Sequence, residues 1–322
     1  MESSKMPQMR VLVTDFCDSK CIYCRPTGEG NLECTDKRYL SYEVAKKAAE
    51  IYKRNGGTEI KISGGDPVFW PYLVEYVRYL KMILKFDRVE MITRSIKIKS
   101  IIDELITAGL DVLNFSLDTI SETQYKRITG KKDFPIFSKI IRDCACKIYC
   151  KINMVVMQNV NPNDWIDMIA FCEDVGIKQL KLLDYIDDLQ GSINDPQSQT
   201  QLYLPFDKVC DELRARYGSE SIIYQGGLGH PMNEFTTNLG LKIICKNSQN
   251  GAWYCEECMG CTNYPCHDAL MALRVTPYNS FQLCLINSEK HWFFDDSTID
   301  KQFSEILSLY QNAFFIGDGD DA

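Results

Sequence analysis

The sequence has no long apolar run, few histidines and no excess of positive charge. No apolar stretch approaches the roughly 20 residues that span a bilayer, and residues 1–5 lack the apolar segment of a secretion signal. The net charge of -8 argues against broad nucleic-acid binding, which needs an extended basic surface. The three histidines form no persuasive ligand set. We therefore expect a cytoplasmic protein that binds neither membranes nor nucleic acid.

Cysteine, by contrast, is abundant. There are 15 in the chain, an odd number, and many lie in groups rather than in an even framework of pairs. In a reducing compartment such cysteines serve as metal ligands or as small buried side chains more often than as disulfides. The length of 322 residues allows two domains, and the 45% hydrophobic content is enough for a sizeable core.

Short β-branched runs alternate with helical patterns over the first two thirds of the chain. The expected strands are Met9–Thr14, Glu59–Ser63, Val89–Thr93, Val112–Leu117, Ile148–Val156 and Gln179–Leu183. The expected helices are Ser41–Asn55, Pro71–Leu84, Lys99–Ala108, Ile136–Lys147, Asn163–Val175 and Pro205–Tyr217. This alternation predicts an α/β fold with helices packed on a parallel sheet, either open or curled into a barrel. In both cases the functional loops should follow the carboxyl ends of the strands.

The pattern changes after about residue 186. A polar stretch at 187–200 predicts a linker or loop, and a cysteine-rich unit follows later. We therefore expect a larger domain over 1–220 and a smaller one over 221–322.

The most specific pattern is a cysteine triad directly after the first expected strand. Cys17, Cys21 and Cys24 have the spacing C-x3-C-x2-C. Three thiolates on one tight loop can hold three irons of a 4Fe-4S cluster and leave the fourth iron open to a small molecule. A zinc clip or a set of buried cysteines is the alternative, although structural zinc normally takes four ligands in two paired knuckles.

This spacing resembles the signature of the radical S-adenosylmethionine (SAM) superfamily, in which the amino and carboxylate groups of SAM chelate the open iron. Further phrases resemble the GTP 3′,8-cyclase family of molybdenum-cofactor biosynthesis, and they lie at residues 63–67, 114–119, 125–130, 151–157 and 273–277. The resemblance implies a partial (β/α)6 barrel with a smaller C-terminal domain that carries an auxiliary 4Fe-4S cluster.

The resemblance also implies site residues. Cys17, Cys21 and Cys24 become the ligands of the SAM cluster, and the SAM contacts become Tyr23, Ser63, Gly64, Gly65, Asp66, Thr93, Ser116 and Lys181. Lys181 stands where the family has an arginine, so the charge is kept but the bidentate fork is lost. Arg10, Lys151 and Arg274 match positions that bind the substrate.

In the C-terminal part, Cys255, Cys258 and Cys284 match the auxiliary-cluster ligands, with Cys261 or Cys266 as a candidate fourth. A cluster with four protein thiolates has no open iron and could not ligate a substrate base. Ala272 also replaces one arginine of the family, and the chain ends in an acidic stretch.

The resemblance implies a radical SAM enzyme with SAM and two 4Fe-4S clusters. It would cleave SAM to a 5′-deoxyadenosyl radical that abstracts hydrogen from a small-molecule substrate, and an electron donor such as a flavodoxin or ferredoxin would reduce it. One hypothesis is cyclisation of a purine nucleotide. Its rival is a modifying enzyme with a fully ligated auxiliary cluster that acts on a peptide, sugar or aminocyclitol. A third is an iron-sulfur or zinc protein that senses or scaffolds without catalysis.

Overall fold

A computed structural model of the chain describes residues 6–24, 37–185, 202–218, 220–225, 228–262, 264–266, 270, 272–284, 291–295 and 297–317. The linker expected at 187–200 lies outside these ranges. Within the described residues, no helix combines the length and apolar character needed to cross a membrane.

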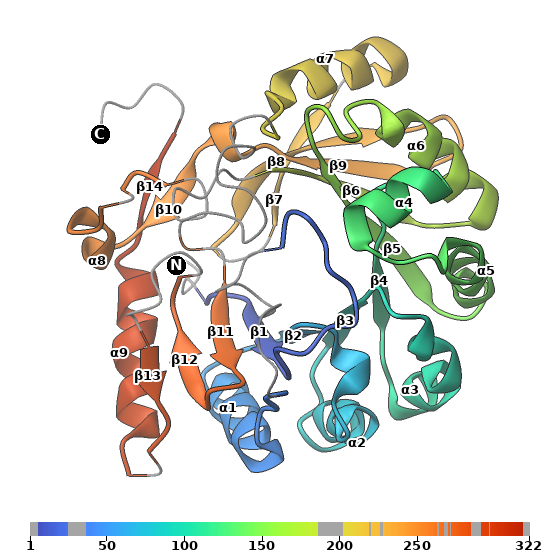
Figure 1. Cartoon of the computed structure of the whole chain (residues 1–322). Helices are drawn as coiled ribbons and strands as arrows, with labels where there is room; N and C mark the ends of the chain where they lie inside the picture. Colours follow the sequence, from blue (N-terminus) through green and yellow to red (C-terminus); the bar gives the residue numbers. More distant parts are fainter. Residues whose placement is uncertain are drawn as a thin grey trace.

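Six parallel strands form the centre of the molecule and lie beside one another in chain order. They are β1 (Met9–Leu12), β2 (Glu59–Ser63), β3 (Arg88–Thr93), β4 (Val112–Ser116), β5 (Tyr149–Val156) and β6 (Gln179–Asp184). Figure 1 shows that they curve around a central space, with helices on the outside. This arrangement confirms a partial barrel, because a doubly wound sheet would reverse its strand order.

The helices that follow these strands are α1 (Tyr42–Arg54), α2 (Leu73–Arg78), α3 (Ile102–Ala108), α4 (Glu122–Thr129), α5 (Phe134–Ala145) and α6 (Asp164–Val175). Two expected helices are irregular. A π-helical turn at Tyr79–Ile83 continues α2, and a 3-10 turn at Ile96–Ser100 precedes α3. The sequence patterns did not predict α4, a short helix that Ser121 caps by accepting a hydrogen bond from Gln124 N.

Later elements extend the same sheet on both sides. They are α7 (Phe206–Tyr217), β7 (Ser221–Gln225), β8 (His230–Thr236), β9 (Lys242–Lys246), β11 (Leu273–Thr276), β12 (Ser280–Gln282) and β13 (His291–Phe293). Strand β9 pairs in parallel with β6, and β11 pairs in parallel with β1. A second small sheet joins β10 (Ala252–Tyr254) to β14 (Phe314–Ile316), beside α8 (Glu256–Met259) and α9 (Ile299–Gln311). The sheet thus crosses residue 220, and a domain boundary there stays a prediction.

The barrel strands alternate between apolar and polar side chains. The apolar positions pack in the core under the helices, and they include Val11, Ile62, Met91, Phe115, Ile152 and Leu182. The intervening positions point to the opposite face because side chains alternate along a strand. They include Arg10, Lys61, Glu90, Asn114, Lys151, Asn153 and Lys181. The lumen of the barrel is therefore polar and carries charge.

Candidate active site

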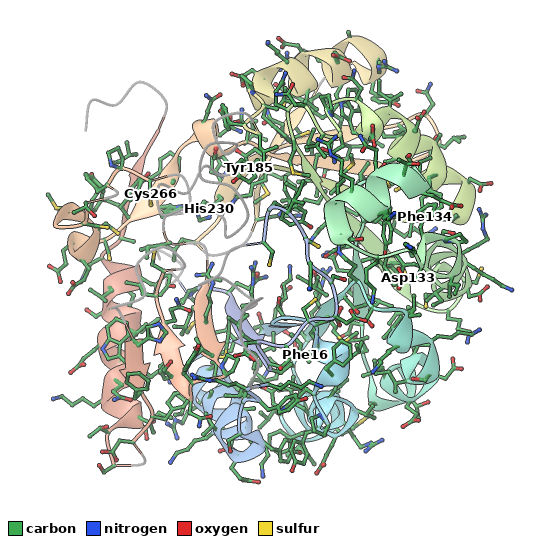
Figure 2. The ribbon with its side chains drawn as sticks, in the orientation of Figure 1. Phe16, Asp133, Phe134, Tyr185, His230 and Cys266 are labelled. Atoms are coloured by element: carbon green, nitrogen blue, oxygen red, sulfur yellow. The ribbon has the colours of Figure 1, made fainter. Side chains whose placement is uncertain are left out.

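The cysteine triad lies on the loop that follows β1. The backbone N–H groups of Lys20 and Ile22 donate to the carbonyls of Thr129 and Ile128, each at 2.9 Å. The end of α4 thus anchors the cysteine loop at its middle. Phe16, labelled in Figure 2, packs edge-on against Phe69 with ring centroids 4.7 Å apart and holds the start of the loop.

Two glycines bring the loop after β2 against the cysteine loop. A Cβ on Gly64 would lie 2.4 Å from the carbonyl oxygen of Thr14, and one on Gly65 would lie 2.2 Å from that of Phe16. Gly64 also has a φ of +138°, which side chains rarely allow. The amide of Gly65 donates to Thr14 O at 2.6 Å. The glycines therefore permit close packing of two loops, and the Gly65 amide is already used within the protein.

Asp66 lies next in the chain and is buried. Its carboxylate accepts hydrogen bonds from Thr93 Oγ1 at 2.8 Å and from the amides of Arg94, Ser95 and Val68 at 2.8, 3.1 and 3.2 Å. Burial raises the pKa of Asp66 to about 6, although these donors oppose the shift. Asp66 lines the pocket, but its carboxylate oxygens bind the neighbouring loop, and its expected contact with SAM stays a prediction.

These loops enclose a cavity of about 170 Å³ at the carboxyl ends of the strands. The described residues that line it are Cys17, Ser19, Cys21, Tyr23, Cys24, Ser63, Gly64, Gly65, Asp66, Ile92, Thr93, Arg94 and Ser116. All three cysteines of the triad are present, together with each expected SAM contact except Lys181. Residues from four strand ends thus meet in one pocket.

The donor set suits an iron-sulfur cluster. Burial raises the pKa of Cys17 to about 12 and also raises the pKa of Cys21, so the free groups are thiols at neutral pH. A bound metal deprotonates such thiols. In the described ranges, no three thiol, imidazole or carboxyl groups already form a metal-binding cluster. The fit therefore rests on the three thiols that share one pocket wall.

A buried network that the sequence did not predict joins the cysteine loop to β3 and β4. Arg94 Nη2 donates to Asp118 Oδ2 at 2.5 Å and to the hydroxyl of Tyr23 at 2.6 Å. Tyr23 in turn donates to Asp118 Oδ2 at 3.0 Å. The Asp118 carboxylate raises the pKa of Arg94 although burial opposes the charge. This network fixes the segment between Cys21 and Cys24.

A second group of charges lies in the barrel lumen. The strand register aligns Arg274 with Arg10, Arg10 with Lys61, and Lys61 with Glu90. Glu90 forms ion pairs with Lys61 at 2.9 Å and with Lys151 at 3.1 Å. Its pKa is lowered because the attraction of these lysines outweighs the effect of burial. The three predicted substrate residues therefore share this face with Lys61 and Glu90, which the sequence reasoning missed.

Lys181 belongs to this lumen group. Burial lowers its pKa strongly, and the charges of Lys61 and Lys246 lower it further. It is not among the described residues that line the cysteine pocket. Its expected contact with SAM stays a prediction. The alternation of polar and apolar residues along β2 and β3 was the available signal for Lys61 and Glu90.

The C-terminal cysteines lie around β10 and α8. The sulfur atoms of Cys255 and Cys258 are 3.9 Å apart, and the hydrogen bond between them lowers the pKa of Cys255. Cys258 and Cys266 both pack against the small cluster of Ala252 and Tyr254, and the hydroxyl of Tyr254 donates to Cys266 O at 2.6 Å. Figure 2 shows Cys266 in the same region. Cys284 follows β12, and its grouping with this pair stays a prediction.

The sequence of this chain is similar to those of known proteins. A sequence model described as "Radical SAM superfamily" matches residues 11–172. A probable GTP 3′,8-cyclase of Pyrococcus horikoshii is 26% identical over 286 residues, covering 87% of this chain and 84% of that protein. A probable GTP 3′,8-cyclase of Archaeoglobus fulgidus is also 26% identical, over 305 residues, covering 93% of this chain and 90% of that protein.

Solved structures show the likeness in fold. SuiB of Streptococcus suis bound to the precursor peptide SuiA superposes with a TM-score of 0.65 at 14% identity, covering 96% of this chain and 65% of that one. SuiB bound to S-adenosylmethionine gives a TM-score of 0.60 at 15% identity, covering 87% and 60%. This chain thus spans less than two thirds of the length of SuiB.

Proposed function

The chain belongs to the radical SAM superfamily, and we propose that it cleaves SAM reductively in the cysteine pocket and directs the radical to an anionic substrate in the barrel lumen. This proposal rests on the set of residues that line the cysteine pocket. Cys17, Cys21 and Cys24 share it with Gly64 and Gly65.

Cys17, Cys21 and Cys24 would hold a 4Fe-4S cluster, which with SAM and one electron from a flavodoxin or ferredoxin supplies a 5′-deoxyadenosyl radical and methionine. Ser63, Thr93 and Ser116 offer hydroxyl groups at the strand ends for SAM. The chain's further task is positioning. The lumen must hold the target C–H bond close to the pocket and keep other C–H and S–H groups away from the radical.

For the substrate we propose an anion similar to the purine nucleotide of GTP 3′,8-cyclase. Arg274, Arg10 and Lys61 lie in register across three neighbouring strands, and Lys151 lies on β5. A row of cations on one face suits phosphate groups, which attract arginine and lysine strongly. Arg274 is almost fully buried, so its charge acts in a medium that screens weakly.

Two observations favour a second candidate, a modifying enzyme with a closed auxiliary cluster that acts on a peptide, sugar or aminocyclitol. Glu90 already compensates Lys61 and Lys151, which reduces the charge available to a polyphosphate. Cys266 packs against the same small cluster of Ala252 and Tyr254 as Cys258, which makes it a candidate for a fourth thiolate. A closed cluster would have no iron for a purine base.

The first experiment is to reconstitute the protein anaerobically, add SAM and dithionite, and measure 5′-deoxyadenosine. We expect the product from the wild type and none from Cys21→Ala. Cys146→Ala is the matched control, because Cys146 is exposed and distant from both cysteine groups in the sequence. A reconstituted wild type that leaves SAM intact would instead indicate a sensing or scaffold protein.

The second experiment separates the two substrate candidates. GTP is added to the reconstituted protein, and the spectrum of the auxiliary cluster is recorded in the Cys21→Ala background. A GTP-induced change favours the nucleotide, and an unchanged spectrum favours the closed cluster.

A further inference from the structure

The cysteine pocket has an uneven charge pattern. Its wall carries three thiols and the carboxyl of Asp66, and Arg94 is the one cationic side chain among the described residues that line it. The carboxylate of Asp66, and the three cysteines once a bound metal deprotonates them, favour cationic groups. Among the described lining side chains, an anionic group therefore has only Arg94 as a cationic partner.

The guanidinium of Arg94 is held rigidly at one end. Nη2 is fixed by Asp118 at 2.5 Å and by Tyr23 at 2.6 Å, and the backbone amide is fixed by Asp66. The planar group therefore has a defined direction before any ligand binds, which lowers the entropy cost of binding.

The other end of the guanidinium is unused. Arg94 is 7% exposed, and its Nη1 is buried without a hydrogen-bond partner among the described residues. A buried donor on a charged group that lacks a partner is costly. A ligand oxygen in the pocket would remove this cost.

We infer that Arg94 Nη1 binds the carboxylate of SAM, a role that the sequence resemblance had given to Lys181. SAM carries one anionic group, the carboxylate, together with an ammonium and a sulfonium, and only the carboxylate is attracted to a guanidinium. A carboxylate has two oxygens, so one can accept from Arg94 while the other takes a second partner. Lys181 lies instead on the lumen face of β6, near the charges of Lys61 and Lys246, and is not among the described residues that line the cysteine pocket.

This inference rests on the proposed function, since it assumes that the pocket holds SAM. It is tested by equilibrium dialysis of the oxidised holoenzyme with SAM and with decarboxylated SAM, which lacks the carboxylate. The preference for SAM over the decarboxylated ligand is compared in wild type, Arg94→Gln and Lys181→Gln. Glutamine keeps a donor for Asp118 and Tyr23 but removes the charge.

We expect Arg94→Gln to reduce this preference by about tenfold or more, because a charge-assisted hydrogen bond is lost from one ligand only. Lys181→Gln should change it by less than about twofold. Equal weakening of both ligands in Arg94→Gln, or loss of the preference in Lys181→Gln, would overturn the inference.

Iron content checks that each variant holds its clusters. If Arg94→Gln loses iron, Arg94→Lys decides, because lysine carries a single nitrogen. When that nitrogen pairs with Asp118, no second nitrogen is left in the position of Nη1. A preference unchanged in Arg94→Lys would then contradict the inference. A wild type that binds no SAM contradicts the proposed function itself, whereas normal SAM cleavage with an unchanged preference contradicts only the role of Arg94.

Discussion

The backbone N–H of Arg94 donates to the carboxylate of Asp66 at 2.8 Å, and this contact joins the loops that follow β2 and β3. Asp66 directly follows the glycine pair, and the Arg94 side chain reaches Tyr23 on the cysteine loop. One buried carboxyl group therefore aligns three segments of the pocket, which are far apart in the sequence.

We expect the stability of the cluster-free protein to depend on the charge of Asp66. Its folded-state pKa of about 6 lies above the ordinary value of 3.8, so its contribution is fully present below about pH 4 and is lost as pH rises through 6. The free energy of unfolding of wild type relative to Asp66→Asn should fall by roughly 3 kcal/mol over that range. Urea unfolding at several pH values measures it, and a constant difference would contradict the raised pKa.

Gly65→Ala should disrupt the pocket. The new Cβ would meet the backbone of Phe16 at 2.2 Å, and a backbone atom cannot rotate away as a flexible side chain can. We expect a loss of about 2 kcal/mol in the free energy of unfolding and reduced iron uptake. Gly260→Ala is the control for unfolding of the cluster-free protein, because its Cβ would meet nothing within 4 Å. Similar stabilities of the two variants would refute the steric argument.

Glu90→Gln should increase affinity for nucleoside triphosphates. The substitution removes the charge that compensates Lys61 and Lys151 but keeps an oxygen that can accept from Asn114. We expect GTP to bind about tenfold more tightly, as measured by anaerobic titration calorimetry. Glu104→Gln on the exposed face of α3 is the matched control. Unchanged GTP affinity would indicate that phosphates do not reach these lysines.

Cys266→Ala should lower iron content if Cys266 closes the auxiliary cluster. Two 4Fe-4S clusters correspond to about eight irons per chain, and loss of one leaves about four. For a closed cluster we expect both Cys255→Ala and Cys266→Ala to approach the lower number. For an open cluster only Cys255→Ala should do so, and Cys146→Ala keeps the higher number in both cases. Full iron content in Cys266→Ala would remove the structural argument for a closed cluster.

The barrel strands were predicted closely because each carries its own local pattern. The expected Glu59–Ser63 coincides with β2, and Gln179–Leu183 differs from β6 by one residue. Helix α4 was missed because its eight residues are too few for a clear period. The irregular ends of α2 and α3 were missed for a related reason, since tertiary packing rather than propensity sets such boundaries.

The sequence by itself determined the C-x3-C-x2-C spacing of Cys17, Cys21 and Cys24, the glycine pair and the parallel barrel strands, because these depend on neighbours within a few residues. Only the tertiary structure decided that Arg94 lies in the pocket with Tyr23 and Asp118, and that Glu90 pairs with two lysines in the lumen. It also placed β9 and β11 on either side of the barrel. Strand register and burial create such contacts, which join residues that are distant in the chain.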